Sequence, residues 1–181
     1  MASYYYLVAS LPMLRFEDDP PITLEQFLAD CQQSLNAKDY AIVFELAAGN
    51  LESIASQSTY VKHWKRFLDS LNGLLFEARS TALSREIDDR KVVTDANVHL
   101  QAIVKQAMQA ENPLEAELLL MHFQWEMAQE LSQSRVFELE VLLTYAIQLA
   151  LLERKSLFTP MEGNAEFKRL FSNLQSIIKS I

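Results

Sequence analysis

One stretch of this chain, from Ser134 to Leu157, is apolar on almost every side when it is read as a helix. Its polar stripe consists of Glu140, Thr144 and Gln148, which follow one another at spacings of four residues. A helix with so little polar surface has to be covered by other elements. The pattern therefore predicts either the central helix of the fold or a helix whose face meets another protein.

The composition indicates that the surrounding elements are helices too. Glycine occurs only three times in 181 residues, and the abundant Leu, Ala, Glu and Gln lose little rotamer freedom in a helix. We expect an all-α fold, a compact bundle of about six to eight helices around a central apolar helix near 134–157. A chain of this length can fold as a single domain, 1–181, without disulfides or metals. If it is subdivided, the loop at 111–113 is where the boundary falls.

Capping and breaking residues place the ends of the other helices. Thr23 and Gln26 have the spacing of a capping box, and Pro113 suits a first helical turn. Gly73 lies inside a long helical pattern, where it could allow a bend or a close helix contact. The expected elements are a strand or short helix at 3–11 that Pro12 ends, helices at 23–35 and 36–50, a loop at 51–58, helices at 59–87, 95–110 and 113–131, and a last helix beyond 159–164.

Apolar stripes at helical spacing indicate which faces enter the core. The helix at 113–131 carries two such stripes, so we expect it to pack on two sides. The tyrosines at 4–6 are expected to fasten the start of the chain to the core. The stripes are Leu24, Phe27, Leu28, Cys31 and Leu35; Tyr40, Val43, Phe44 and Ala47; Leu114, Leu118, Met121, Trp125 and Ala128 with Ala116, Leu120, Phe123, Met127 and Leu131; and Phe167, Leu170, Phe171, Leu174, Ile177 and Ile178.

Charge and cysteine content narrow the partners and the compartment. The net charge is −8, which disfavours binding to nucleic acid because phosphate backbones are negative. When the chain is divided into residues 1–60, 61–110 and 111–181, only the middle segment has a net positive charge. The single cysteine, Cys31, fits a reducing compartment. A secretory signal would require a basic residue near the start of the chain, and none precedes Arg15. The apolar run at 141–152 is too short to span a bilayer. We therefore expect a cytoplasmic protein.

The residue patterns of common catalytic and metal sites are missing. A di-iron site needs Glu-x-x-His pairs, and none of the three histidines is preceded by Glu at that spacing. His122 and Glu126, four residues apart, are expected on a solvated face. Cys31 lies on an apolar stripe, where a buried and inert thiol is the default. We therefore expect that the chain is not an enzyme and holds no metal or cofactor. The alternative is an enzyme with a cryptic catalytic site, which would need a deep pocket with converging titratable groups.

One cluster has the composition of an interaction site. Lys62, Lys65 and Arg66 flank Trp64 in the helix expected at 59–87. They could form a patch for an acidic partner, with the tryptophan as its anchor. The simpler interpretation, which we favour, is an amphipathic helix with a solvated basic side.

Three segments carry a resemblance to known families. The start YYYLVASLPML, the loop DDPPITLEQFL and the stretch VFELEVLLTYAIQLALLERKSLFTPMEGNAEFKRLFSNL resemble an uncharacterised bacterial family encoded beside genes of V-type (A/V-type) ATPases. The late stretch is also similar to the end of the C/d family of V-type ATPase subunits. There a Phe-Glu-x-x-Leu-x-Tyr pattern begins a helix that ends in a Glu-Arg-like pair. Here Phe137, Glu138, Leu142 and Tyr145 occur in the same order at longer spacings, as Phe-Glu-x-x-x-Leu-x-x-Tyr, and the pair is Glu153 and Arg154.

The resemblance implies a non-catalytic role in ion or proton transport. The chain would be a structural or accessory component of a V-type ATPase, like the component that couples the rotor ring to the central stalk. Its partners would be other V-type ATPase subunits, which would hold it at the inner face of the membrane. The C/d proteins are much longer and form a funnel of repeated helical units, so this chain could supply part of a funnel, form a homodimer or act in assembly. The alternative is an unrelated helical adaptor or scaffold whose partner binds the apolar faces at 114–152.

Overall fold

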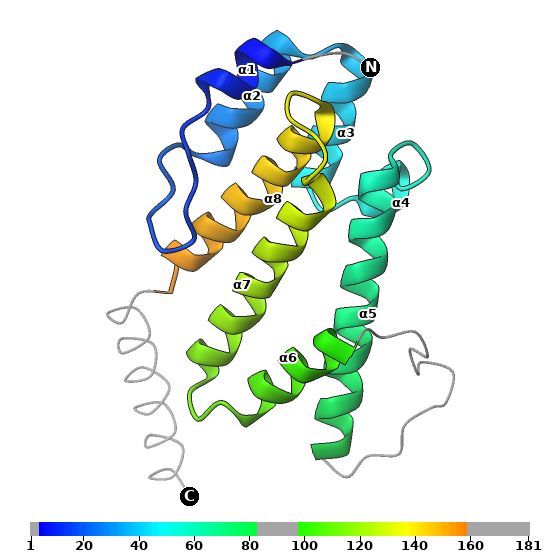
Figure 1. The fold of residues 1–181 in the computed structure, drawn as a ribbon, viewed down its shortest axis with the longest axis vertical. Helices are drawn as coiled ribbons and strands as arrows, with labels where there is room; N and C mark the ends of the chain where they lie inside the picture. Colours follow the sequence, from blue (N-terminus) through cyan, green and yellow to red (C-terminus); the bar gives the residue numbers. More distant parts are fainter. Residues whose placement is uncertain (1–3, 83–97, 159–181) are drawn as a thin grey trace, which may run out of the picture.

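The computed structural model describes residues 4–82 and 98–158, and this part of the chain consists of helices and the loops between them, without strands. Figure 1 shows the helices arranged as a bundle, with α5, α7 and α8 as its long members. The all-α prediction is confirmed. The eight helices within the described ranges are α1 (Tyr5–Ser10), α2 (Leu24–Ser34), α3 (Ala37–Ala47), α4 (Leu51–Ile54), α5 (Thr59–Ala82), α6 (Val98–Gln109), α7 (Pro113–Ser132) and α8 (Leu139–Ser156).

Local capping sets the starts of α2, α3 and α7. The Thr23 side chain accepts from the backbone N–H of Gln26, and the Gln26 side chain accepts from the backbone N–H of Thr23, which completes the predicted capping box. Asn36 caps α3 in a similar way. Asn112 caps α7, and Pro113 occupies its first turn. Short-range sequence signals therefore fix these three boundaries.

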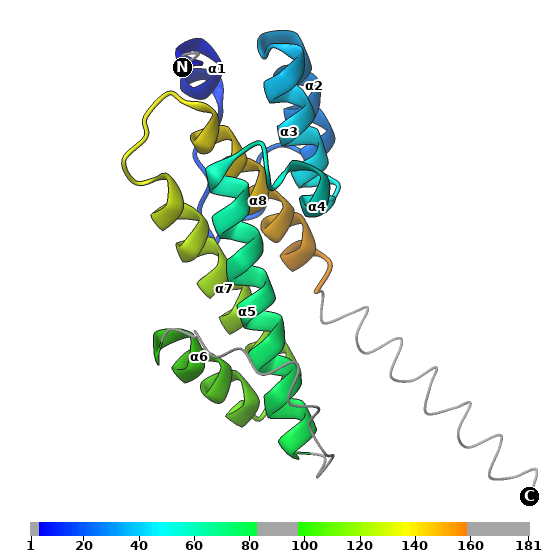
Figure 2. The ribbon, with the colours of Figure 1, turned by 90° about the vertical axis from the view of Figure 1, so that its right-hand side faces the viewer.

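Helix α8 is the central helix of the fold, as its apolar pattern predicts. It packs against α2, α3 and α7, and Figure 2 shows it running between α7 and the pair formed by α2 and α3. It begins at Leu139 rather than near Ser134, because Glu138 is the extended N-cap residue. The buried residues are Leu142, Leu143, Thr144, Ala146, Ile147, Gln148, Leu149, Leu151 and Leu152.

Helix α7 connects two hydrophobic clusters, which confirms that it packs on two sides. Met121, Trp125 and Ala128 belong to the larger cluster around α8. Leu120 and Phe123 belong to the smaller cluster, which they form with α5 and α6. One helix therefore joins both parts of the core, and the subdivision near 111–113 stays a prediction.

Three local expectations are wrong. Residues 51–58 are not all loop, because Leu51–Ile54 form α4 and bury Ile54. Phe44 is 45% exposed, and Ile42 and Leu46 instead join Val43 in the buried face of α3. Of the first tyrosines only Tyr4 is buried, and Tyr6 is 88% exposed. The sequence left the exposure of the polar stripe of α8 open, and the fold buries most of it, since Thr144 and Gln148 lie in the core.

Some expected features lie outside the described residues. These are the break near 88–90, the cap at Asp95 and the last helix beyond 159–164. The long helical pattern that begins at Thr59 is confirmed as far as Ala82 and contains Gly73 without interruption.

Candidate interaction surface

The described part of the chain contains no group of three or more His, Cys, Asp or Glu side chains that could hold a metal ion. His122 and Glu126 form a weak i,i+4 contact, with Nδ1 and Oε1 3.8 Å apart and both side chains well exposed. Cys31 is completely buried, and burial raises the pKa of its thiol to about 12. Such a thiol stays protonated and unreactive near neutral pH.

The predicted basic cluster on α5 separates into a buried residue and a polar face. Trp64 is only 5% exposed and packs in the larger cluster, with its ring centroid 5.3 Å from that of Phe67. It is therefore not available as a protruding anchor. Lys62 and Arg66 are both exposed, on the other side of the helix. A role of these cations in binding an acidic partner stays a prediction.

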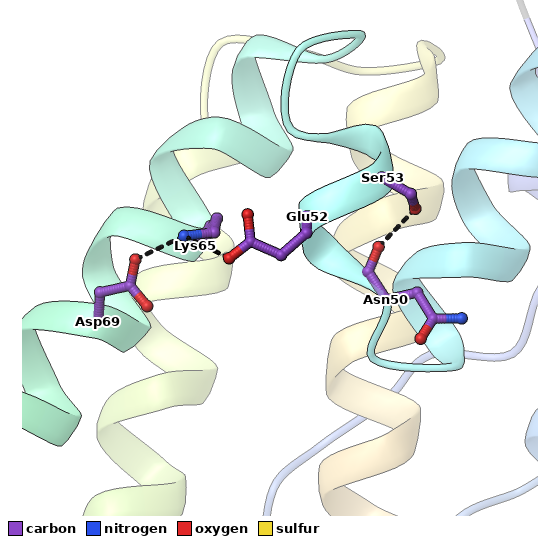
Figure 3. Close-up of polar contacts among 5 residues, drawn as sticks. All are labelled: Asn50, Glu52, Ser53, Lys65 and Asp69. Atoms are coloured by element: carbon purple, nitrogen blue, oxygen red, sulfur yellow. Dashed lines mark hydrogen bonds and ion pairs between the residues drawn. The ribbon is translucent and has the colours of Figure 1, made fainter.

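Lys65 is held by acidic side chains of the chain itself. Figure 3 shows its ammonium group between the carboxylates of Glu52 on α4 and Asp69 on α5, at 3.1 and 2.9 Å. The hydrogen bond with Asp69, followed by that with Glu52, raises the pKa of Lys65. On α4 itself, the Ser53 hydroxyl donates to the carbonyl of Asn50 at 2.8 Å (Figure 3). Lys65 therefore links α4 to α5, and its charge is largely balanced within the chain.

An apolar cleft of about 240 Å³ lies beside Trp64. Its walls come from the end of α3, the start of α4, the first half of α5, the middle of α7, and α8 from its middle to its last turn. Arg154 and Gln124 are the polar side chains at its edge. The side-chain lining includes Leu46, Leu51, Trp64, Leu68, Ile147 and Leu151. This cleft has a surface suited to apolar side chains and lacks converging titratable groups.

A second apolar surface lies where α1 meets the segment before α8. We call it the aromatic end, and it consists of Tyr5, Tyr6, Val136 and Phe137. The ring centroids of Tyr5 and Phe137 lie 4.7 Å apart, and those of Tyr5 and Tyr6 lie 5.5 Å apart. Tyr5, Tyr6 and Val136 are all more than half exposed. Clustered exposed apolar side chains are typical of interaction surfaces.

The residues that carry the family resemblance make internal contacts. Tyr145 donates its hydroxyl hydrogen to the Pro12 carbonyl at 3.1 Å. The Glu153 carboxylate accepts from the backbone N–H of Leu24 at 2.6 Å, at the first residue of α2. Arg154 forms an ion pair with Glu117 of α7. These three contacts attach α8 to distant parts of the chain.

The next residue, Lys155, holds the loop between α1 and α2. Its ammonium group donates to the carbonyls of Phe16 and Asp18, and it lies over the Phe16 ring, 5.2 Å from the centroid. Lys155 thus joins Glu153 in securing the segment that precedes α2. The pattern from Phe137 to Lys155 is accounted for by packing and by polar links within the fold.

A compact polar network is buried between α5, α7 and α8. The Tyr60 hydroxyl lies 2.8 Å from Thr144 Oγ1 and 3.2 Å from the Ala128 carbonyl, to which Thr144 also donates at 3.0 Å. Burial raises the pKa of Tyr60. One turn further along α8, Gln148 is also buried, and its Nε2 has no hydrogen-bond partner within the described residues. No sequence pattern marked these contacts, because they join helices far apart in the chain.

The surfaces predicted from sequence differ from those that the fold exposes. The apolar faces at 114–152, where an adaptor's partner was expected to bind, are largely buried, apart from Leu114 and Val136. The cleft and the aromatic end were not foreseen, because each combines residues from several elements. In the described ranges, no helix has the length and apolar character needed to cross a membrane.

Comparison with known proteins adds one family match. A family model described as a protein of unknown function (DUF2764) matches residues 92–178, a range that contains α6, α7 and α8. The chain is thus similar to this family over its last three described helices. No curated protein and no solved structure matches the chain.

Proposed function

We propose that this chain is a non-catalytic structural or accessory component of a V-type ATPase, with a role like that of the component that couples the rotor ring to the central stalk. Its partners are V-type ATPase subunits, and through them it is peripheral to the inner face of the membrane. The proposal rests on the resemblance of the segment from Phe137 to Arg154 to the end of the C/d family.

The contacts of that segment support a structural role. Leu142 is fully buried, Tyr145 binds the loop before α2, and Glu153 binds the first turn of α2. Residues that take part in catalysis have to face a substrate, whereas residues with these contacts hold helices in place. A part whose function is to transmit force or to position other proteins needs such rigid attachment.

Affinity purification from the native cell tests the proposal. The full chain carries a tag, the membranes are solubilised in a mild detergent, and untagged cells provide the background. We expect components of a V-type ATPase to be enriched with the tagged chain. Recovery with the complete ATPase indicates a stoichiometric component, and recovery with free ATPase subunits alone indicates an assembly factor. Recovery of the chain without any part of the ATPase would refute the proposal.

The aromatic end favours a second candidate, an unrelated helical adaptor or scaffold. Tyr6 and Val136 are exposed near the ring pair of Tyr5 and Phe137, and aromatic side chains are frequent anchors at interfaces. In this case the double variant Tyr6→Ser and Val136→Ser loses its partner while retaining its helical content. Met13→Ser is the matched control, because Met13 is also largely exposed. Equal partner recovery from both variants would exclude the aromatic end as the binding surface.

A further inference from the structure

The apolar cleft beside Trp64 lies next to the point where the described chain ends. Its lining includes Leu151 and Arg154 in the last turns of α8. The chain then leaves α8 through Leu157 and Phe158, both of which are exposed. Another 23 residues, 159–181, follow in the sequence. The segment that continues from α8 therefore starts within about one helical turn of the cleft wall.

The sequence of this segment has the pattern of an amphipathic helix. Its apolar residues recur at spacings of three and four and form one stripe. Pro160 and Gly163 precede the stripe, and both residue types favour a change of chain direction. Residues 164–178 would extend about 22 Å as a helix, which is slightly less than the about 27 Å of α8. The stripe consists of Phe167, Leu170, Phe171, Leu174, Ile177 and Ile178.

The cleft can hold part of such a stripe. A cavity of about 150 Å³ can hold a benzene ring, so the about 240 Å³ available here can take one or two large apolar side chains. Gln124 and Arg154 are the polar side chains of the lining, and Arg154 is already paired with Glu117. The rest of the cleft wall is apolar, as a partner for the stripe requires.

We propose that residues 164–178 dock as an amphipathic helix into the apolar cleft formed by α3, α4, α5, α7 and α8 of the same chain. Docking removes the cleft surface and the apolar stripe from water together, which is the main source of free energy for helix packing. The cleft is then an internal docking site, and an external partner reaches it only by displacing this segment.

Chemical crosslinking of the purified full chain tests the docking. Ala47→Cys places a thiol in the cleft wall, and Phe171→Cys places a second thiol on the apolar stripe. Ser172→Cys, away from the stripe of the predicted helix, replaces Phe171→Cys in the matched control. The native thiol of Cys31 is fully buried, so a short bismaleimide reacts mainly with the introduced thiols. We expect crosslinking within one chain to be about tenfold faster for the Phe171→Cys pair, because docking raises the effective concentration of the two thiols.

A second measurement follows the maleimide labelling of a single introduced thiol and changes only one residue of the stripe. In Ala47→Cys alone, docking should protect the introduced thiol from maleimide, and adding Leu174→Glu should speed its labelling about tenfold, since a charged residue disfavours burial. Adding Ser172→Glu should leave the rate unchanged. Equal rates in all three proteins, or crosslinks found only between two chains, would overturn the proposal. The tests use purified protein, so their outcome is independent of the ATPase assignment.

Discussion

Replacing Tyr60 by Phe removes one hydroxyl from the buried network and changes almost nothing else. In the native protein, Tyr60 and Thr144 have two hydroxyl hydrogens for the three close contacts among Tyr60, Thr144 and the Ala128 carbonyl. Two hydrogen bonds can therefore form at once. In Tyr60→Phe, Thr144 still donates to Ala128, so one bond remains and no buried donor is left without a partner.

The expected cost follows from this count. One net intramolecular hydrogen bond contributes about 1 kcal/mol to stability, and Phe fills the same space as Tyr without leaving a cavity. We expect the free energy of unfolding to fall by about 1 kcal/mol, which lowers Tm by about 2–4 °C for a chain of this size. Tyr6→Phe is the matched control, because Tyr6 is 88% exposed and its variant should change stability by less than about 0.5 kcal/mol.

The same substitution should change how stability depends on pH. Burial raises the pKa of Tyr60, while the hydrogen bond with Thr144 opposes the shift. As pH rises above about 10, the unfolded chain releases the Tyr60 proton first, so the free energy of unfolding decreases with pH. Tyr60→Phe removes this contribution and should make the alkaline decrease shallower. Urea unfolding from about pH 8 to about pH 11.5, which brackets the ordinary tyrosine pKa, measures both effects. Unchanged stability together with an unchanged alkaline slope would refute this account of the network.

Three further substitutions test other parts of the fold, each by urea unfolding. Gln148→Leu should leave stability unchanged or raise it by about 1 kcal/mol, because it removes a buried donor without a partner in the described residues; a loss above about 1 kcal/mol would contradict this. Glu153→Ala should cost about 1–2 kcal/mol by removing the acceptor for the N–H of Leu24, and Glu153→Gln should recover part of the loss; equal stability of both variants would argue against the contact. Gly49→Ala should cost about 1 kcal/mol because φ is +79°, with Gly49→Asn milder. Since a Cβ there meets nothing within 4 Å, a much larger loss would be unexplained.

The boundaries of several helices could be predicted because their causes are local. The Thr23 box and the Asn112–Pro113 start depend on residues within one helical turn, and both are present in the fold. The start of α8 was placed too early, because Val136 and Phe137 extend the apolar pattern ahead of the helix. Only the extended conformation at Glu138 separates them from the helix.

The candidate surfaces were predicted less well, since a helical pattern does not reveal what covers each side. Trp64 has the flanking charges of a surface anchor but packs inside the larger cluster. Lys65 belongs to the predicted basic patch, yet it is balanced by Glu52 from a helix that was expected to be loop. In both cases the deciding neighbour lies on another element.

The helical class, the central position of α8 and the two-sided packing of α7 can all be derived from the order of the amino acids. These properties follow from the periodicity of apolar residues, which is a local physical requirement for burying one or more helix faces. Which polar groups are buried, which charges are paired and where apolar surface stays open depend instead on how the helices pack together. The Tyr60, Thr144 and Ala128 network, the Lys65 link and the cleft beside Trp64 all join residues from different helices. Such contacts depend on how the helices are placed against one another, and the spacing of residues along one helix does not contain that information.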